Sequence, residues 1–336
     1  MGTTDRTHGG DRGSVPAPER RPLGRTGLGI TPVGLGTWAI GGGGWEFGWG
    51  SQDDRRSREA IDRAIAAGIN WIDTAPVYGT GHAEEVVGST LRGRSDRPFL
   101  FTKVSLRWDA QRKVVHDLRP ESIRAEVEES RHRLGVDRLD LVQVHWPEPD
   151  PEIEAAWRAL AELKDRGLVA HIGVSNFDVP QLERAARIAP VETLQPPYSL
   201  VDPEVEEEIL PYARDHHIGV IAYSPMGTGL LTGTMTPERV ARMPPDDWRR
   251  RSREFQEPRL SRHRALADLL GEIGATHGGR SAGEVAIAWT LANPAVTGAI
   301  VGARSAEQVD GFRGALTLRL TRDDLERIAR FRREHP

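Results

Sequence analysis

Short apolar segments alternate along the chain with longer segments whose apolar residues recur every three to four positions. The first kind is typical of buried parallel strands, and the second of helices that bury one face. We expect strands at residues 34–39, 70–73, 98–104, 139–145, 170–176, 191–195, 219–223 and 297–302. We expect helices at residues 51–67, 82–91, 120–134, 151–166, just after 180, 204–215, 262–277, 282–292, 305–312 and 322–332.

Eight short strands that are each followed by a helix predict an α/β fold, a (β/α)8 TIM barrel. Residues 21–33 alternate around glycines and predict a β-hairpin before the barrel, and the last helices extend the chain beyond it. Ser51 is a candidate N-cap for the first helix. Residues 1–20 contain few large apolar side chains and predict a flexible tail, which leaves residues 21–336 as a single domain.

An open doubly wound sheet is the alternative fold, and it needs a glycine fingerprint that opens a helix. Residues 34–39 match the pattern G-x-G-x-x-A, but residues 40–50 are a glycine- and tryptophan-rich run that does not form a helix. We therefore interpret residues 34–39 as the first strand and residues 40–50 as a loop.

Charge and composition exclude several classes of partner. The formal net charge is −4, so no global basic field indicates nucleic acid. No run approaches 18 apolar residues, which predicts no membrane span, and the N-terminus lacks an apolar signal segment. The absence of cysteine fits a reducing compartment, and we expect a cytoplasmic protein. We expect a monomer, because no helix shows an apolar face left over for a partner subunit.

Lysine is rare in this chain, which draws attention to one position. Of the 45 basic residues only Lys103, Lys113 and Lys164 are lysines. Lys113 and Lys164 lie in polar, helix-like surroundings and are expected at the surface. Lys103 lies inside an apolar, β-branched and aromatic run, which predicts a buried ammonium group.

Four polar residues are expected to meet at one end of the barrel. Asp73, Lys103 and His145 are 30 and 42 residues apart, about one βα unit each, and all lie where a strand should end. Tyr78 follows Asp73 in the adjacent loop. Taken singly, Asp73 could be a helix cap or part of a salt bridge, and Lys103 could be part of an ion pair inside the barrel. His145 could be a core histidine, and Tyr78 a packed aromatic ring. Together they predict a catalytic site.

The chemistry of the four groups is that of proton transfer to a carbonyl oxygen. A lysine ammonium beside a phenol is expected to lower the pKa of Tyr78, while Asp73 keeps Lys103 charged. Tyr78 could then protonate the oxygen as a hydride reaches the carbon. The His145 imidazole could orient or polarise the carbonyl group. The spacing of the histidines predicts no metal site.

At these residues the chain resembles the aldo-keto reductases. The resemblance spans about residues 21–331 and rests on D-T-A-P-V-Y-G, F-T-K-V, L-V-Q-V-H-W, G-V-S-N-F and Y-S-P-M-G-T-G-L-L-T-G. It implies that Asp73, Tyr78, Lys103 and His145 form the catalytic tetrad of that family, with NADPH bound across the barrel mouth.

The resemblance also implies a set of cofactor-binding residues. Ser175, Asn176 and Gln195 are expected at the carboxamide, and Tyr223 on the nicotinamide ring. The remaining expected contacts are Thr37, Trp38, Ser224, Met226, Gly227, Leu230, Gly302, Arg304 and Gln308. Arg304 is expected to bind the 2′-phosphate. Gly311 and Phe312 stand where the family usually has Glu-Asn, so the preference for NADPH rests mainly on Arg304.

Three functions stay open at this point. The first is an NADPH-dependent carbonyl reductase that acts on a small-molecule aldehyde or ketone. The second is an NADPH-binding regulatory subunit that resembles the potassium-channel β-subunits. The third is a barrel hydrolase or isomerase with Asp73 as base. Candidate walls of the substrate pocket are Trp38, Trp45, Trp49 and Trp146, and residues 246–251 either fold over the cofactor or form a solvated loop.

Overall fold

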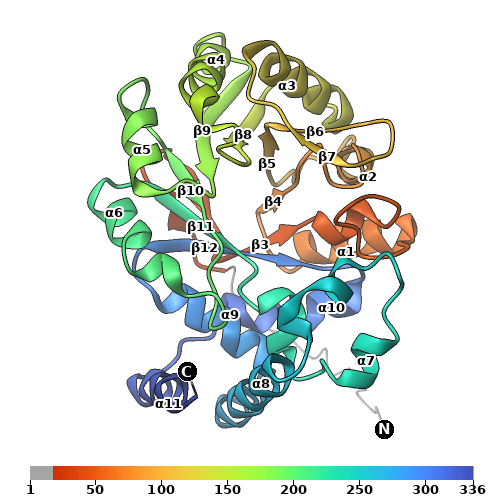
Figure 1. Ribbon diagram of the computed structural model, residues 1–336, viewed down its shortest axis with the longest axis vertical. Helices are drawn as coiled ribbons and strands as arrows, with labels where there is room; N and C mark the ends of the chain where they lie inside the picture. Colours follow the sequence, from red (N-terminus) through yellow and green to blue (C-terminus); the bar gives the residue numbers. More distant parts are fainter. Residues whose placement is uncertain (1–17, 336) are drawn as a thin grey trace, which may run out of the picture.

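The computed structural model describes residues 18–335 and contains a closed barrel of parallel strands surrounded by helices (Figure 1). The predicted (β/α)8 barrel is confirmed. Around the barrel the strands follow the order β10-β11-β12-β3-β4-β5-β8-β9. Their bounds are β3 Val33–Gly36, β4 Trp71–Asp73, β5 Phe99–Val104, β8 Leu139–Val144, β9 Val169–Ser175, β10 Thr193–Gln195, β11 Gly219–Tyr223 and β12 Val296–Gly302.

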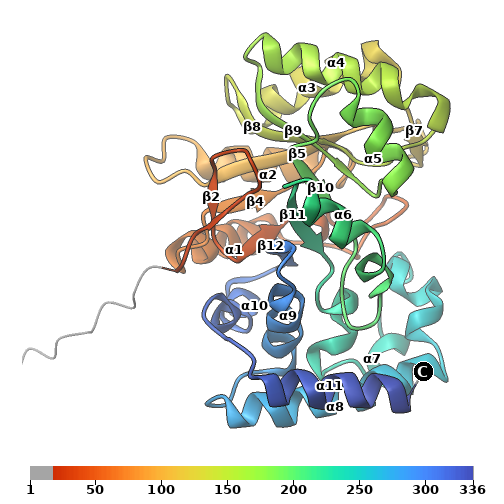
Figure 2. The same ribbon diagram turned by 90° about the vertical axis from the view of Figure 1, so that its left-hand side faces the viewer.

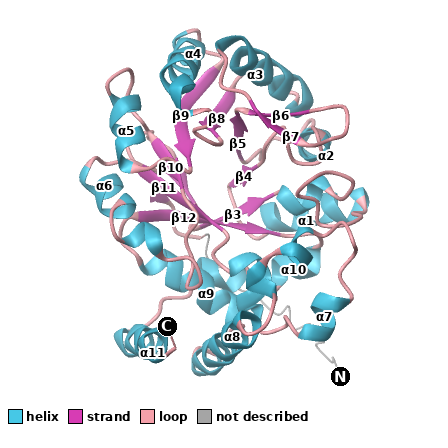
Figure 3. Ribbon diagram, viewed as in Figure 1, coloured by secondary structure: helices cyan, strands magenta, loops and turns pink. Residues whose placement is uncertain are grey.

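The helices form the outer layer, and colouring by secondary structure separates this layer from the strands inside it (Figure 3). Their bounds are α1 Asp54–Ala66, α2 His82–Leu91, α3 Pro120–Leu134, α4 Ile153–Asp165, α5 Val179–Ala186, α6 Ile209–Asp215, α7 Pro237–Ala241, α8 Arg259–Thr276, α9 Ala282–Ala292, α10 Ala306–Asp310 and α11 Arg322–Glu334. The helices α8 and α11 lie side by side outside the ring (Figure 2).

The prediction that Ser51 caps the first helix was wrong. Helix α1 begins at Asp54, and the Asp53 carboxylate accepts hydrogen bonds from the main-chain N–H groups of Arg55 and Arg56. Ser51 instead belongs to the preceding loop. A carboxylate satisfies two of the unpaired N–H groups at the start of a helix and also interacts favourably with the helix dipole.

A β-hairpin closes the amino-terminal end of the barrel. Strands β1 (Arg21–Pro22) and β2 (Gly29–Ile30) pair in antiparallel register, as the sequence predicted. Leu23 and Ile30 pack with Trp71 in a cluster of fully buried side chains. A Cβ atom on Gly34 would lie 2.2 Å from the Trp71 ring, so the first glycine of the fingerprint-like motif makes room for a core indole. Strand β3 ends at Gly36 and a 3₁₀ helix follows at Trp38–Gly41, so the motif opens no α-helix, but Trp38 and Ala39 do not belong to the predicted strand.

The sequence did not predict a second hairpin, β6 (Leu106–Trp108) and β7 (Val114–His116). Lys113 precedes β7 in an exposed turn, so its expected helix-like setting was wrong, whereas Lys164 lies in α4 and pairs with Glu192.

Residues 1–17 of the expected tail lie outside the described residues. Within residues 18–335, no helix combines the length and the apolar character needed to cross a membrane.

Candidate active site

The four residues expected to converge do meet at the carboxyl-terminal ends of the barrel strands. Asp73 is the last residue of β4, Lys103 lies near the end of the neighbouring strand β5, and His145 directly follows β8. Tyr78 comes from the tight turn after β4. Parallel strands that end at the same rim of a barrel bring residues together that are far apart in sequence.

Lys103 is the centre of the site. Its ammonium Nζ lies 2.6 Å from Asp73 Oδ1, 3.2 Å from the Tyr78 hydroxyl and 3.1 Å from the main-chain oxygen of Thr74. The Lys103 side chain is fully buried and that of Asp73 almost fully. All three donor positions of the ammonium are therefore used, and the group is held in one orientation against the phenol.

Burial and charge act in opposite directions on these three groups. Burial alone would lower the pKa of Lys103, but Asp73 and Tyr78 together raise it above its ordinary value. Burial raises the pKa of Asp73, against the effect of Lys103 and Gln195. Burial also raises the pKa of Tyr78, and Lys103 only reduces that rise. The expected lowering of the Tyr78 pKa was therefore wrong, because desolvation of the phenolate outweighs the nearby positive charge.

His145 lies beside the phenol as a neutral imidazole. The two rings meet edge to face with centroids 5.9 Å apart. Burial, and then the positive charge of Lys103, holds the pKa of His145 well below its ordinary value. Its Nδ1 atom is buried and has no hydrogen-bond partner among the described residues. The imidazole is thus positioned for hydrogen bonding without carrying a charge at neutral pH.

Two buried glutamines extend the site below the tetrad. The Gln195 Nε2 atom lies 2.9 Å from Asp73 Oδ2 and 2.9 Å from Gln143 Oε1. Gln143 was not among the predicted site residues, and its place two positions before His145 in a strand is the signal that could have found it. We call Asp73, Tyr78, Lys103, Gln143 and Gln195 the polar core.

The other residues expected at a nicotinamide also lie at this rim. Asn176 donates to the His145 main-chain oxygen at 2.9 Å and accepts from the Tyr223 hydroxyl at 2.9 Å. The Ser175 hydroxyl donates to the Gln195 main-chain oxygen at 2.7 Å. Thr37 is fully buried and bonds to the Asp73 main-chain oxygen. These contacts involve the ends of six strands: β3, β4, β8, β9, β10 and β11.

Four tryptophans cover Tyr78 from the solvent side, and we call Trp38, Trp45, Trp49 and Trp248 the tryptophan cluster. Trp38 stacks on Tyr78 with centroids 6.3 Å apart, and Trp248 stacks on Trp38 at 5.4 Å. Trp45 contacts Tyr78 at 6.4 Å, and Trp49 meets Trp38 edge to face at 5.5 Å. The cluster therefore continues from the phenol to the molecular surface.

Trp146 is placed differently from the other expected pocket walls. Its main-chain N–H and C=O both bond to the Ser105 hydroxyl, and its side chain is exposed.

Trp248 was not predicted as a site residue, although it is the only aromatic residue in the arginine- and aspartate-rich run 246–251. The main-chain N–H of Trp248 donates to the main-chain oxygen of Gly48, and the Arg251 guanidinium donates to the main-chain oxygen of Glu46. Residues 246–251 thus lie over the mouth of the barrel, with Trp248 and Arg249 half-buried and Asp246, Arg250 and Arg251 exposed to solvent.

Arg304 joins the end of β12 to the loop after β3. Its guanidinium donates to the Gln52 side-chain oxygen at 2.7 Å and to the main-chain oxygens of Trp49 and Ser51, all of which are neutral. Gln308 accepts from the Arg304 main-chain N–H at 2.7 Å, and Gly302 is exposed at the strand end. Burial lowers the pKa of Arg304, the charges of Arg249 and Arg56 lower it further, and the Asp247 carboxylate partly opposes them. A cation in such surroundings favours an anionic ligand.

The segment after β11 has an unusual backbone. Ser224, Gly227, Thr228 and Gly229 all have positive φ angles, of 56°, 55°, 52° and 105°. Strained non-glycine residues of this kind concentrate at ligand sites. Leu230, by contrast, is buried in an apolar cluster with Met235 and Phe255, so its side chain is packed into the protein. Met226 lies against Gly283 of α9, which also places its side chain toward the helix layer.

The residues at the mouth fit a large polar ligand. The indole N–H groups of Trp49 and Trp248 are buried without a hydrogen-bond partner among residues 18–335. A buried donor without an acceptor is costly, so an oxygen-rich ligand at this position would be stabilised by them. With Arg304 and the positive-φ segment, these donors suit the phosphate groups of a nicotinamide dinucleotide.

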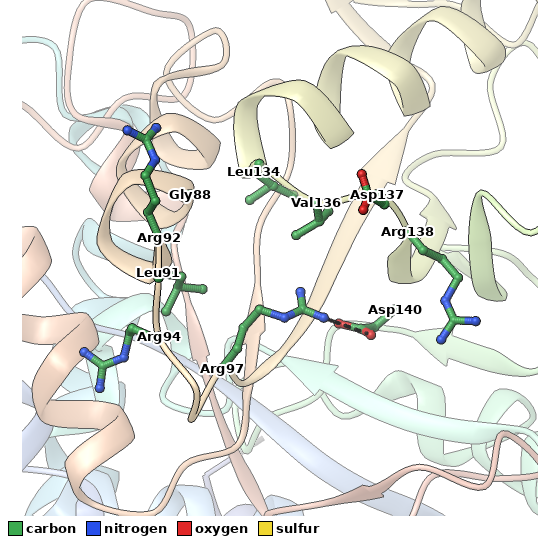
Figure 4. Close-up of a pocket in the computed structure, with 12 residues that line it drawn as sticks. Gly88, Leu91, Arg92, Arg94, Arg97, Leu134, Val136, Asp137, Arg138 and Asp140 are labelled. Atoms are coloured by element: carbon green, nitrogen blue, oxygen red, sulfur yellow. Dashed lines mark hydrogen bonds and ion pairs between the residues drawn. The ribbon is translucent and has the colours of Figure 1, made fainter.

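A separate pocket lies between the ends of α2 and α3, on the amino-terminal face of the barrel. Figure 4 shows Arg97 directed toward Asp140, with which it bonds at 3.2 Å, and Arg92 and Arg138 pointing away from each other. None of the expected site residues lines this pocket, so it is not the catalytic site.

The chain is similar to known proteins over most of its length. The sequence pattern described as the aldo/keto reductase family matches residues 32–333. The chain is 39% identical over 266 residues to aldo-keto reductase YhdN of Bacillus subtilis (strain 168), covering 79% of this chain and 80% of that protein. It is 33% identical over 290 residues to the NADH-specific methylglyoxal reductase of Escherichia coli (strain K12), covering 82% and 87%.

Solved structures agree with this similarity. The glycerol dehydrogenase from Gluconobacter oxydans superimposes with a TM-score of 0.84 at 37% identity, covering 95% of each chain. The holo form of an aldo-keto reductase from Bacillus halodurans superimposes with a TM-score of 0.77 at 25% identity, covering 94% of this chain and 96% of that one.

Proposed function

The chain belongs to the aldo/keto reductase family, and from this premise we propose that it reduces an aldehyde or ketone to the alcohol with NADPH, using Tyr78 as the general acid. The observation that carries the proposal is the buried contact of the Tyr78 hydroxyl with the Lys103 ammonium at 3.2 Å. Because the pKa of Tyr78 is raised, the phenol is protonated at neutral pH and holds the proton that the reaction consumes.

The surroundings of Tyr78 make proton donation favourable at the moment it is needed. As the carbonyl oxygen gains negative charge, the Tyr78 proton moves to it, and the resulting phenolate lies next to the Lys103 ammonium. Asp73 compensates the charge of Lys103 and keeps it in place. The neutral His145 imidazole lies beside the phenol and is available to hydrogen-bond the carbonyl oxygen.

NADPH, when bound, supplies the hydride to the carbonyl carbon. Residues available to hold the nicotinamide end are Ser175, Asn176, Gln195 and Tyr223. The phosphate groups would be held by the segment 224–229 and by Arg304, aided by the indole N–H groups of Trp49 and Trp248. A relative is NADH-specific, so the choice of NADPH rests on the half-buried charge of Arg304 and its neutral partners.

An enzyme is favoured over the regulatory subunit that the sequence left open. The relatives reported above are named as reductases and a dehydrogenase, and the four groups needed for catalysis lie in contact. The family assignment likewise removes the barrel hydrolase or isomerase from consideration.

The substrate is a small carbonyl compound that fits beneath the tryptophan cluster. Trp38 and Trp45 lie next to Tyr78, so a planar or sugar-like molecule would contact ring faces on its way to the phenol. The names of the relatives suggest methylglyoxal, and glycerol in the direction of oxidation, as first substrates to test.

The proposal is tested by turnover with each cofactor. Purified protein is incubated with NADPH or NADH and a panel of methylglyoxal, an aromatic aldehyde and a ketone, and cofactor oxidation is followed optically. We expect turnover with NADPH and a higher kcat/KM than with NADH. Binding of NADPH without turnover of any carbonyl compound would support the regulatory alternative, and a preference for NADH would remove Arg304 as a phosphate ligand.

A further inference from the structure

Two glutamines in the interior of the barrel are linked to the catalytic carboxylate. Gln143 is fully buried on β8, and Gln195 is almost fully buried on β10. Gln195 Nε2 lies 2.9 Å from both Asp73 Oδ2 and Gln143 Oε1. Gln143 Nε2 lies 3.2 Å from the main-chain oxygen of Val174 on β9. A continuous line of hydrogen bonds therefore runs from a strand backbone to the catalytic site.

The acceptors in this line determine which way each amide points. A main-chain oxygen and an ionised carboxylate only accept hydrogen bonds, so an NH₂ group must face each of them. Gln143 consequently directs its nitrogen to Val174 and its oxygen to Gln195. Gln195 directs its nitrogen to Asp73 and to Gln143, and its own carbonyl oxygen is turned away from both.

Asp73 depends on this line for one of its two oxygens. Oδ1 is held by the Lys103 ammonium at 2.6 Å and Oδ2 by Gln195. A carboxylate held at both oxygens does not rotate, and Lys103 then stays at 3.2 Å from the Tyr78 hydroxyl. If the Gln195 amide were free to turn, Asp73 would lose its second contact.

We propose that Gln143 is a positioning residue of the active site, which holds the Gln195 amide and thereby fixes Asp73 and the Lys103 ammonium against Tyr78. The inference rests on the proposed function, in which Tyr78 supplies the proton. It assigns a role to a strand residue that touches neither substrate nor cofactor, and whose effect reaches Tyr78 through three other side chains, Gln195, Asp73 and Lys103.

The pH dependence of turnover gives a readout that a merely structural residue would not change. The titratable groups that face Asp73 are Lys103 from β5 and Tyr78 from the loop after β4, while His145 lies beside Tyr78. Strands β3 and β10 contribute no titratable side chain. The N–H of Gln195 stabilises the Asp73 carboxylate, so its loss raises the pKa of Asp73. The acid limb of the profile then moves to higher pH.

The experiment compares Gln143→Leu with Gln143→Glu in the complete enzyme. For Gln143→Leu we expect kcat to fall about 10- to 100-fold, the scale of a small misplacement of catalytic groups. We also expect its acid limb at higher pH. Gln143→Glu retains the acceptor for Gln195 and, when protonated, a donor for Val174, so it should recover turnover at low pH and lose it as the pH rises.

A matched control lies on β10. Thr193 is fully buried, and its hydroxyl has no hydrogen-bond partner among the described residues, so Thr193→Val should leave kcat and the pH profile unchanged. Wild-type kcat and an unshifted acid limb in Gln143→Leu would overturn the proposal. If that variant does not fold, the absence of pH-dependent recovery in Gln143→Glu would overturn it equally.

Tyr78→Phe separates this inference from the proposed function. If Tyr78→Phe retains turnover, the assignment of the acid is wrong and the proposed function fails. If Tyr78→Phe is inactive while Gln143→Leu keeps the kcat and pH profile of the wild type, only the positioning role fails.

Discussion

The polar core and the tryptophan cluster meet at Tyr78 but are built in different ways. In the polar core, charged and amide groups on strands and the Tyr78 phenol on a loop are held by hydrogen bonds of 2.6–3.2 Å and are buried. In the tryptophan cluster, rings from two loops meet at centroid distances of 5.4–6.4 Å, and two indole N–H groups have no partner among residues 18–335.

This difference separates the chemistry from the admission of ligands. A buried ion pair is strongly destabilising to break, because one partner is left as an uncompensated charge. An aromatic contact between loops is worth only about 0.5–1.5 kcal/mol beyond its buried area. The polar core is therefore suited to keep one geometry, whereas each contact in the cluster contributes less. Substitutions in the two regions should differ in size and in the kinetic constant they affect.

The largest effect is expected at Tyr78, where the regions meet. Tyr78→Phe keeps the ring against Trp38 and removes only the hydroxyl, so turnover should fall by about 10²- to 10⁴-fold, the usual worth of general acid catalysis. NADPH affinity, measured by fluorescence titration, should hardly change because the phenol holds no phosphate. Near-normal turnover would remove Tyr78 from the mechanism.

The next effect is expected in the ion pair of the polar core. Lys103→Met should lower turnover by orders of magnitude, because the phenolate loses its neighbouring charge. It should also cost up to about 3–5 kcal/mol in the free energy of unfolding, since Asp73 is left buried without a cation. The double variant Lys103→Met/Asp73→Asn should recover much of that stability and none of the activity. Denaturant unfolding and aldehyde turnover measure the two outcomes, and additive losses in the double variant would show that the residues are not a pair.

An intermediate effect is expected at Arg304, which ties the cluster to the barrel. Arg304→Ala should weaken NADPH binding by roughly 1.5–3 kcal/mol, the scale of a charge-assisted hydrogen bond, and NADH binding much less. Gln52→Leu is the matched control, because it releases the same loop contact and keeps the charge. An equal loss for both cofactors in Arg304→Ala, matching that of Gln52→Leu, would make Arg304 a structural residue only.

The smallest effect is expected within the cluster itself. Trp248→Ala removes the ring that stacks on Trp38 with centroids 5.4 Å apart. The KM for the carbonyl substrate should therefore rise by up to about tenfold, which corresponds to about 1.4 kcal/mol. The kcat value should change little, because the polar core is untouched. Trp248→Phe retains a stacking ring but lacks the indole N–H, so it should lie between the wild type and Trp248→Ala. A large fall in kcat for Trp248→Ala would contradict the separation of the two regions.

The two regions also differ in how far the sequence predicted them. Strand ends recur about once per βα unit, so the meeting of Asp73, Lys103 and His145 followed from spacing once the barrel was recognised. The raised pKa of Tyr78 did not follow, because it depends on how completely the phenol is desolvated. Trp248 was missed because its contact with Trp38 joins positions 210 residues apart, and Trp248 itself lies in a stretch between β11 and α8 that does not follow the βα repeat.

By itself, the sequence determined the barrel, the rim of the barrel that carries the site, and the four groups gathered there. Apolar periodicity and strand spacing are local properties, and a closed parallel barrel allows few other arrangements of them. The tertiary structure alone decided the neighbours of each group: the amide of Gln195 on Asp73, the neutral partners of Arg304 and the indole of Trp248 over Trp38. Such contacts depend on side-chain packing between distant segments, which no periodicity along the chain encodes.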